Sequence, residues 1–285
     1  MATATASQPI NMDGELIWDV SSIPIATSSQ IRTVGFAGEV QDYHGNFSYD
    51  AYGDLTGGTL NSTTFTLNGI QQYTVSGLNH SAVTVFSYIN AYNEPGLLKY
   101  LFNGNDVLNG SSGADIANAY GGNDSLHGNG ANDIVRGGTG NDKVWGNTGG
   151  DTLNGQAGND ILYGGPGKDS LIGGTGNDKF VFDSAGGSNN ADRITDFVHS
   201  ADKIQLDNAD FAGVGATGTL AQGKFFKGAN VDATGANDPT DRVLYDTDSG
   251  KLYYDSDGNG PNGKVLIATV VGDPDNLAFS DIQVI

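Results

Sequence analysis

The chain has 285 residues, no cysteine and 44 glycines, and its 33 acidic against 13 basic side chains give a formal net charge of −20. The absence of cysteine excludes disulfides and thiol chemistry. So acidic a surface is a poor partner for nucleic acid or an anionic membrane, and no apolar run reaches the length of a membrane-spanning helix.

Residues 1–14 predict a flexible N-terminus, and residues 15–100 predict a small β-rich domain that ends in short helices. Alternating apolar and polar residues are separated in this domain by glycine or Asx turns such as Asn68-Gly69. From Ser81 the apolar residues take helical spacing. We expect these short helices to cap the array that follows, because an open solenoid end needs a cap.

One group of aromatic and polar residues in this domain leaves two interpretations open. Its members are Asp42, Tyr43, His44, Tyr49, Tyr52 and Tyr88. Aromatic rings beside polar groups are typical of a carbohydrate-binding platform, but such residues also fit the core and edges of a small β-domain.

Residues 101–181 consist of nine consecutive nine-residue units without insertion. The eighth position is always apolar, and the fourth is glycine except in one unit, which has Ala131. The sixth position is always aspartate: Asp106, Asp115, Asp124, Asp133, Asp142, Asp151, Asp160, Asp169 and Asp178. Turn formation alone would explain the glycines, but it would not explain an aspartate in every unit.

Glycine-rich loops of this kind predict metal binding by oxygen atoms. Glycines allow left-handed turns that direct several carbonyl oxygens at one point, and the aspartate adds a carboxylate. All-oxygen ligand sets favour calcium over zinc or copper. The glycines expected to contribute are Gly104, Gly113, Gly122, Gly137, Gly140, Gly149, Gly155, Gly158, Gly164, Gly167, Gly173 and Gly176.

The spacing also predicts how the units stack. The three residues after each aspartate form a short strand with one side chain inward, so two units make one turn and loops of alternate units lie above one another. One stack then holds five aspartates and the other four. Cations between successive loops would number up to about seven (4 + 3).

The repeat resembles the RTX nonapeptide G-G-x-G-x-D-x-U-x of hemolysin-type calcium-binding proteins. The resemblance implies a parallel β-roll, secretion through the type I machinery, and folding on calcium outside the cell or at its surface. The last residues, AFSDIQVI, are similar to the uncleaved C-terminal secretion signal of that family.

Residues 182–285 predict a C-terminal β-rich cap that includes this signal. Residues 180–206 resemble the flank of serralysin-type proteases, which implies that Asp192 and Asp196 complete a last calcium site. His199 is expected to be solvated in a turn.

A second candidate site lies further along, where Asp255, Asp257 and Asn259 match the first half of an EF-hand loop. Leu266 stands where that loop needs glutamate, so a hairpin turn is favoured over a weak calcium site.

The sequence therefore predicts a mostly all-β protein with a central parallel β-roll and a β-rich domain on either side. It contains no H-E-x-x-H, G-x-S-x-G or Walker motif, so we expect no enzyme. The leading hypothesis is a secreted calcium-binding protein in adhesion or in an exopolysaccharide or biofilm matrix, with surface or matrix polysaccharide as its partner. The alternative is an accessory or catalytic role on polysaccharide through residues 15–100. The third is ice binding, which only Thr139-Gly140-Asn141 and Thr175-Gly176-Asn177 would support.

Overall fold

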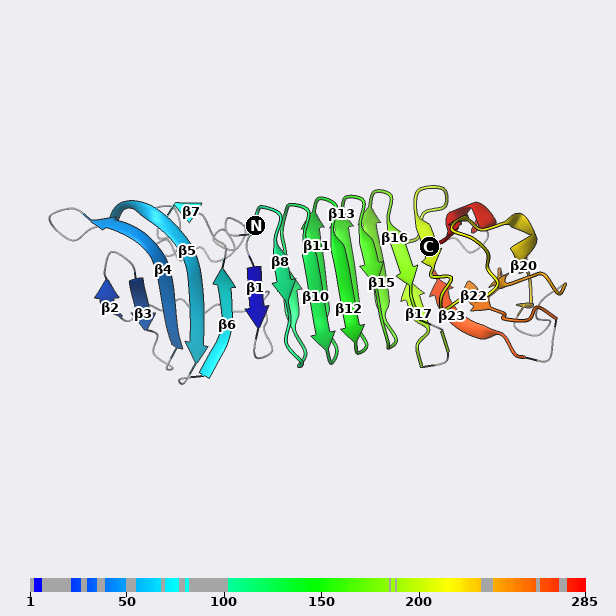
Figure 1. The fold of residues 1–285 in the computed structure, drawn as a ribbon, viewed down its shortest axis with the longest axis horizontal. Helices are drawn as coiled ribbons and strands as arrows, with labels where there is room; N and C mark the ends of the chain where they lie inside the picture. Colours follow the sequence, from blue (N-terminus) through cyan, green and yellow to red (C-terminus); the bar gives the residue numbers. More distant parts are fainter. Residues whose placement is uncertain are drawn as a thin grey trace.

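The computed structural model describes residues 3–6, 22–26, 30–34, 39–49, 55–67, 70–76, 80–81, 102–184, 186–187, 189–231, 238–259, 262–271 and 276–285. Within these residues the fold is mostly β, as predicted. A central roll of parallel strands is continued at both ends by further strands (Figure 1). No helix of the described part is long and apolar enough to cross a membrane.

The roll consists of two parallel sheets that face each other. The first sheet contains β8 (Val107–Asn109), β10 (Ser125–Gly130), β12 (Lys143–Thr148), β14 (Ile161–Tyr163), β16 (Lys179–Phe182) and β18 (Lys203–Leu206). The second contains β9 (Ile116–Asn118), β11 (Ile134–Thr139), β13 (Thr152–Ala157), β15 (Ser170–Thr175) and β17 (Asp192–Ile194). Leu126 is in register with Val144, which confirms that two units make one turn.

The eighth-position side chains fill the space between the sheets, because the strand after each aspartate turns its middle residue inward. All nine belong to one buried core: Leu108, Ala117, Leu126, Val135, Val144, Leu153, Leu162, Leu171 and Phe180. The same core includes Ile194, Phe197, Ile204 and Leu206. Phe180 and Phe197 lie 6.1 Å apart between ring centroids, so the segment after the repeats packs on the same core.

The N-terminal strands continue the first sheet. They are β1 (Thr3–Ala6), β2 (Ser22–Ala26), β3 (Gln30–Val34), β4 (Glu39–Tyr49), β5 (Leu55–Leu67), β6 (Ile70–Ser76) and β7 (His80–Ser81). β1 pairs in parallel with β8 and antiparallel with β6. Of residues 1–14, for which a flexible N-terminus is predicted, the structure describes only Thr3–Ala6. These four residues form β1, which satisfies main-chain groups that β8 would otherwise leave unpaired at the sheet edge.

Other predictions for this domain fall wholly or partly outside the described residues. Ser81 ends β7, and the short helices expected after it would occupy residues that the structure does not describe. Of the aromatic and polar group, Tyr52 and Tyr88 also lie outside, while the other members belong to β4.

The C-terminal residues lengthen both sheets. β23 (Val265–Val270) pairs in parallel with β17 and carries β22 (Lys251–Tyr254), β21 (Val243–Asp246) and β20 (Phe225–Gly228). β24 (Ile282–Val284) pairs with β18 and with β19 (Gly218–Thr219). Two short 3-10 helices, η1 (Gln222–Lys224) and η2 (Phe279–Asp281), precede β20 and β24.

His199 lies exposed in a turn, as predicted, and it also contacts the C-terminal segment. Its Nδ1 lies 2.6 Å from Oδ2 of Asp281, while 43% of the His199 side chain stays exposed. Asp281 is fully buried in η2. The contact joins residues that are 82 positions apart, so it holds the C-terminal segment against the turn after β17.

Candidate calcium sites

The nine repeat aspartates form the two predicted stacks, and all nine are buried. Along each stack, Oδ1 of one aspartate accepts a hydrogen bond from the main-chain N–H of the aspartate 18 residues earlier. The N–O distances are 2.7–2.9 Å. These hydrogen bonds fix each carboxylate in one orientation and connect successive turns.

The second carboxylate oxygen has a different environment. Oδ2 is buried and has no hydrogen-bond donor among the described residues in seven of these aspartates: Asp124, Asp133, Asp142, Asp151, Asp160, Asp169 and Asp178. In Asp115, by contrast, Oδ2 accepts hydrogen bonds from the main chain and hydroxyl of Ser111. A buried carboxylate oxygen without a partner is costly, so this arrangement fits a cation beside each Oδ2.

Burial also changes the protonation of the stacks. Desolvation, with a further contribution from neighbouring aspartates, raises the pKa of Asp124, Asp133 and Asp160 to about 7. Desolvation raises the pKa of Asp142 and Asp178 to about 6. Without a cation, the fold therefore favours partly protonated stacks near neutral pH.

The first-position glycines leave the space that such a cation would need. A Cβ placed on Gly137 would lie within 3.0 Å of both Asp142 Oδ2 and the carbonyl oxygen of Gly155 in the next turn. Gly128, Gly146 and Gly155 have the same relation to the aspartate of their own unit and the carbonyl of the next turn. Carboxylate and carbonyl oxygens thus converge on the same space, and they are the ligands that calcium prefers.

The fourth-position glycines are needed for their backbone conformation. Gly140, Gly149, Gly158, Gly167 and Gly176 have φ between 124° and 154°, a region that other residues avoid. A Cβ on any of them would also strike the carbonyl of the fourth residue one turn earlier. Ala131 takes this position with φ 68°, so its loop is strained. The left-handed geometry predicted for the glycine loops therefore applies to the fourth position and also to the second, where Gly138, Gly165 and Gly174 have φ between 90° and 113°. The first position is glycine for lack of space.

No group of three or more His, Asp or Glu side chains gathers at one point in the described part of the chain. Main-chain carbonyls would therefore have to complete each ligand set.

Sequence comparison agrees with this geometry. The model of the RTX calcium-binding nonapeptide repeat matches residues 100–135, 109–144, 127–156 and 145–180. The chain carries RTX calcium-binding repeats. Proteins with such repeats are typically secreted. No curated protein matches the chain.

Two solved structures are similar to this chain. One is the solution structure of the AlgE6R3 subunit of the Azotobacter vinelandii mannuronan C5-epimerase, with 30% identity over 53% of this chain and 77% of that chain, at a TM-score of 0.38. The other is the extracellular lipase LipA from Serratia marcescens, with 16% identity over 63% of this chain and 38% of that chain, at a TM-score of 0.22.

Both RTX stacks extend beyond the ninth repeat. Asp192 continues one, since its Oδ1 accepts the N–H of Asp169 at 3.1 Å. Asp202 continues the other, since its Oδ1 accepts the N–H of Asp178 at 2.9 Å. The sequence prediction did not assign Asp202 to a site, although Asp202-Lys203-Ile204 repeats the aspartate-x-apolar signal. Asp196 lies outside both stacks and accepts the N–H groups of Gly173 and Gly174.

Asp192 brings two carboxylates to one space. A Cβ on Gly164 would lie within 3.0 Å of Oδ2 of both Asp169 and Asp192. Desolvation, followed by the charge of Asp169, raises the pKa of Asp192 to about 8. We therefore predict that Asp192 belongs to the last calcium site, and that Asp196 positions the loop from outside it.

The EF-hand-like segment forms the connection between two antiparallel strands, β22 and β23. Asp257 donates its N–H to Oδ1 of Asp255 at 3.2 Å, and Asn262 donates its N–H and its Nδ2 to Oδ2 of Asp257. The favoured hairpin turn is thus present, and a weak calcium site at Asp255, Asp257 and Asn259 stays a prediction.

Proposed function

We propose that this protein is a secreted calcium-binding RTX protein whose roll folds when calcium binds outside the cell. The observation that supports this most directly is the set of seven buried Oδ2 atoms in the two stacks that have no donor among the described residues. Each lies at a fixed place, because the Oδ1 of the same side chain is held by a main-chain hydrogen bond.

Without calcium, the roll has little to hold it together. Short strands such as β8, β9 and β14 contribute one buried side chain each, and the many glycines of the roll lose more conformational entropy on folding than other residues do. Aspartates in adjacent turns lie one strand spacing apart, about 4.8 Å, so their charges repel in a poorly solvated interior. Bound calcium supplies positive charge that neutralises the carboxylates. The chain itself supplies the orientation, through the Oδ1 hydrogen bonds and the glycine carbonyls.

We further propose that the folded protein acts without catalysis, in adhesion or in an exopolysaccharide or biofilm matrix. The supporting observation is that calcium-binding repeats fill the centre of the chain and that its sequence lacks the catalytic motifs of RTX proteases and lipases. Matrix and surface polysaccharides are the partners that this role implies.

Circular dichroism of the whole chain, recorded in EGTA and then in millimolar calcium, tests the folding step. We expect a β-sheet signal to appear with calcium and to disappear when EGTA is added back. Identical spectra in both conditions would overturn the proposal. Pull-down on the producer's own exopolysaccharide then tests the role, with retention expected only in calcium.

A further inference from the structure

The outer face of the first sheet carries a row of three aromatic side chains. His127 is in register with Trp145, and Trp145 with Tyr163, at the ninth position of alternate units. The rings are stacked, with centroid distances of 4.5 Å and 5.1 Å and interplanar angles of 6° and 12°. All three side chains are partly exposed. We call this row the aromatic row.

A second row runs beside it at the seventh position. Lys143, Ile161 and Lys179 are in register on β12, β14 and β16. Lys143 is exposed and Lys179 is partly exposed. Neither lysine forms an ion pair within the described part of the chain. Because β14 lies between β12 and β16, the two lysines belong to strands that are two strand spacings apart, roughly 9.6 Å along the roll.

The outer faces of the nine repeats carry no acidic side chain at the seventh or ninth position, although the whole chain is strongly acidic. No aspartate or glutamate occupies the seventh or ninth position of any unit, so the acidic groups of residues 101–181 are the nine buried aspartates. With Arg136, Lys143, Lys168 and Lys179, the segment has a net charge of −5 (4 − 9). Seven calcium ions would change this to about +9 (−5 + 14).

Cross-strand stacking alone would stabilise the sheet, but it does not account for the lysines beside the rings. Partly exposed aromatic rings next to a few placed cations are the composition of a ligand site, and the cations select an anionic ligand. The strand spacing is close to the length of one sugar unit in an extended pyranose chain. Such a chain could therefore lie along the aromatic row, with its acidic groups toward the lysines.

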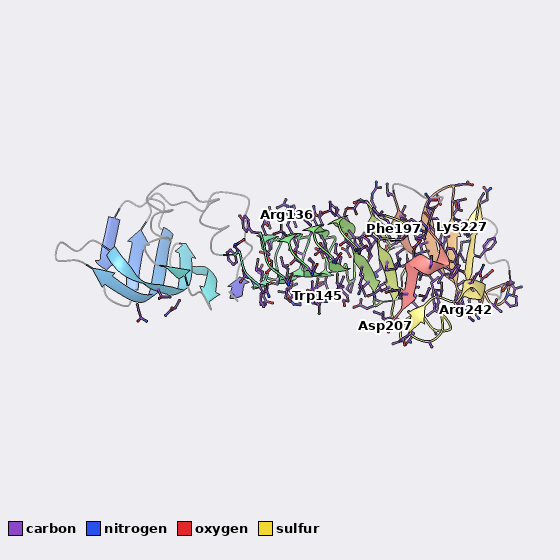
Figure 2. The ribbon with its side chains drawn as sticks, turned by 90° about the horizontal axis from the view of Figure 1, so that it is seen from above. Arg136, Trp145, Phe197, Asp207, Lys227 and Arg242 are labelled. Atoms are coloured by element: carbon purple, nitrogen blue, oxygen red, sulfur yellow. The ribbon has the colours of Figure 1, made fainter. Side chains whose placement is uncertain are left out.

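We propose that the outer face of the first sheet binds an acidic polysaccharide, and that it does so in the calcium-loaded state. The aromatic row contacts the sugar rings, and Lys143 and Lys179 pair with their carboxylates. This proposal rests on the calcium-dependent folding proposed above and names the ligand class and the surface. Figure 2 shows Trp145 and Arg136 on opposite sides of the roll, so variants of the two faces can be compared.

The test measures binding of the whole chain to hyaluronan, an acidic pyranose chain that does not gel with calcium, and to hydroxyethylcellulose as a neutral chain. Binding is measured in millimolar calcium and in EGTA. The variants are Trp145→Ala and the double variant Lys143→Gln/Lys179→Gln. Lys168→Gln is the matched control, because Lys168 is exposed but occupies a loop position outside both rows. Circular dichroism of every sample records the calcium-induced folding separately.

We expect hyaluronan binding in calcium only, weakened about tenfold or more by the double lysine variant and by Trp145→Ala. Lys168→Gln should bind within about twofold of the unchanged chain. The proposal is overturned if the double variant binds normally, if Lys168→Gln loses as much, or if hydroxyethylcellulose binds equally well. A failure of the folding proposal is distinguishable, because circular dichroism would then show no response to calcium.

Discussion

Replacing Asp142 by asparagine isolates the role of the carboxylate in a central turn of the roll. The variant keeps an oxygen that can accept the hydrogen bond from the N–H of Asp124, which is 2.8 Å long. It puts an amide N–H₂ where Oδ2 now faces the space between Gly137 and the carbonyl of Gly155. A donor in that space repels a cation, so the change removes ion binding while it preserves the connection between turns.

The size of the effect follows from the number of ions lost. A site occupied at 100 times its Kd contributes about 2.7 kcal/mol to the folded state. Asp142 has a stacked aspartate on each side, so the loss should be about 2.7 kcal/mol if it serves one ion and about 5 kcal/mol if it serves two. Isothermal titration calorimetry should show one or two fewer calcium ions, and urea unfolding in saturating calcium should show the matching loss.

The same substitution should not harm the calcium-free chain, because it removes a charge whose burial is unfavourable. Asp210→Asn is the control, since Asp210 is exposed outside both stacks. The reasoning fails if Asp142→Asn keeps the full ion count and unfolds within about 0.5 kcal/mol of the unchanged chain. It also fails if Asp210→Asn has the same effect.

Three further predictions concern space, core and protonation. Gly137→Ala should raise the calcium concentration needed for folding, measured by circular dichroism, whereas Gly104→Ala should be tolerated because a Cβ on Gly104 meets nothing within 4 Å; equal effects of the two would refute this. Leu153→Ala, at a fully buried position, should lower the unfolding free energy in calcium by about 2–5 kcal/mol, and a loss below about 1 kcal/mol would show that the core is looser than the structure indicates. Burial raises the pKa of Asp124 and Asp160 from 3.8 to about 7, so the calcium-free fold loses stability as the pH rises between these two values. In EGTA, the β-sheet signal should therefore increase when the pH is lowered from about 8 to about 5. An unchanged signal would contradict the burial of the stacks.

The parts of the fold that sequence could predict are those governed by a short period. The nine aspartates and the apolar eighth positions specify turns, stacks and core, because each relation links residues 18 positions apart. The extension by Asp202 breaks this period, since it follows Asp178 by 24 positions. The pairing of Thr3–Ala6 with β8 joins residues about a hundred positions apart, and nothing in a Thr-Ala alternation indicates such a partner.

Protons and calcium can both neutralise the buried carboxylates of the stacks, but the two states differ in net charge and in the links between turns. Protonation of the nine aspartates would leave residues 101–181 with only their four basic side chains, a charge of +4. It would provide no ligand bond between turns, so the thin core and the Oδ1 hydrogen bonds would still have to overcome the entropy of the glycine-rich chain. Calcium held in the space where the carboxylate of one turn meets the carbonyl of the next would link the two turns and would also add positive charge. Because residues 101–181 hold their acidic groups in the interior and none on their outer faces, calcium bound inside this segment would change the sign of its net charge. The same ions that fold the roll would thus prepare its outer face for an anionic partner.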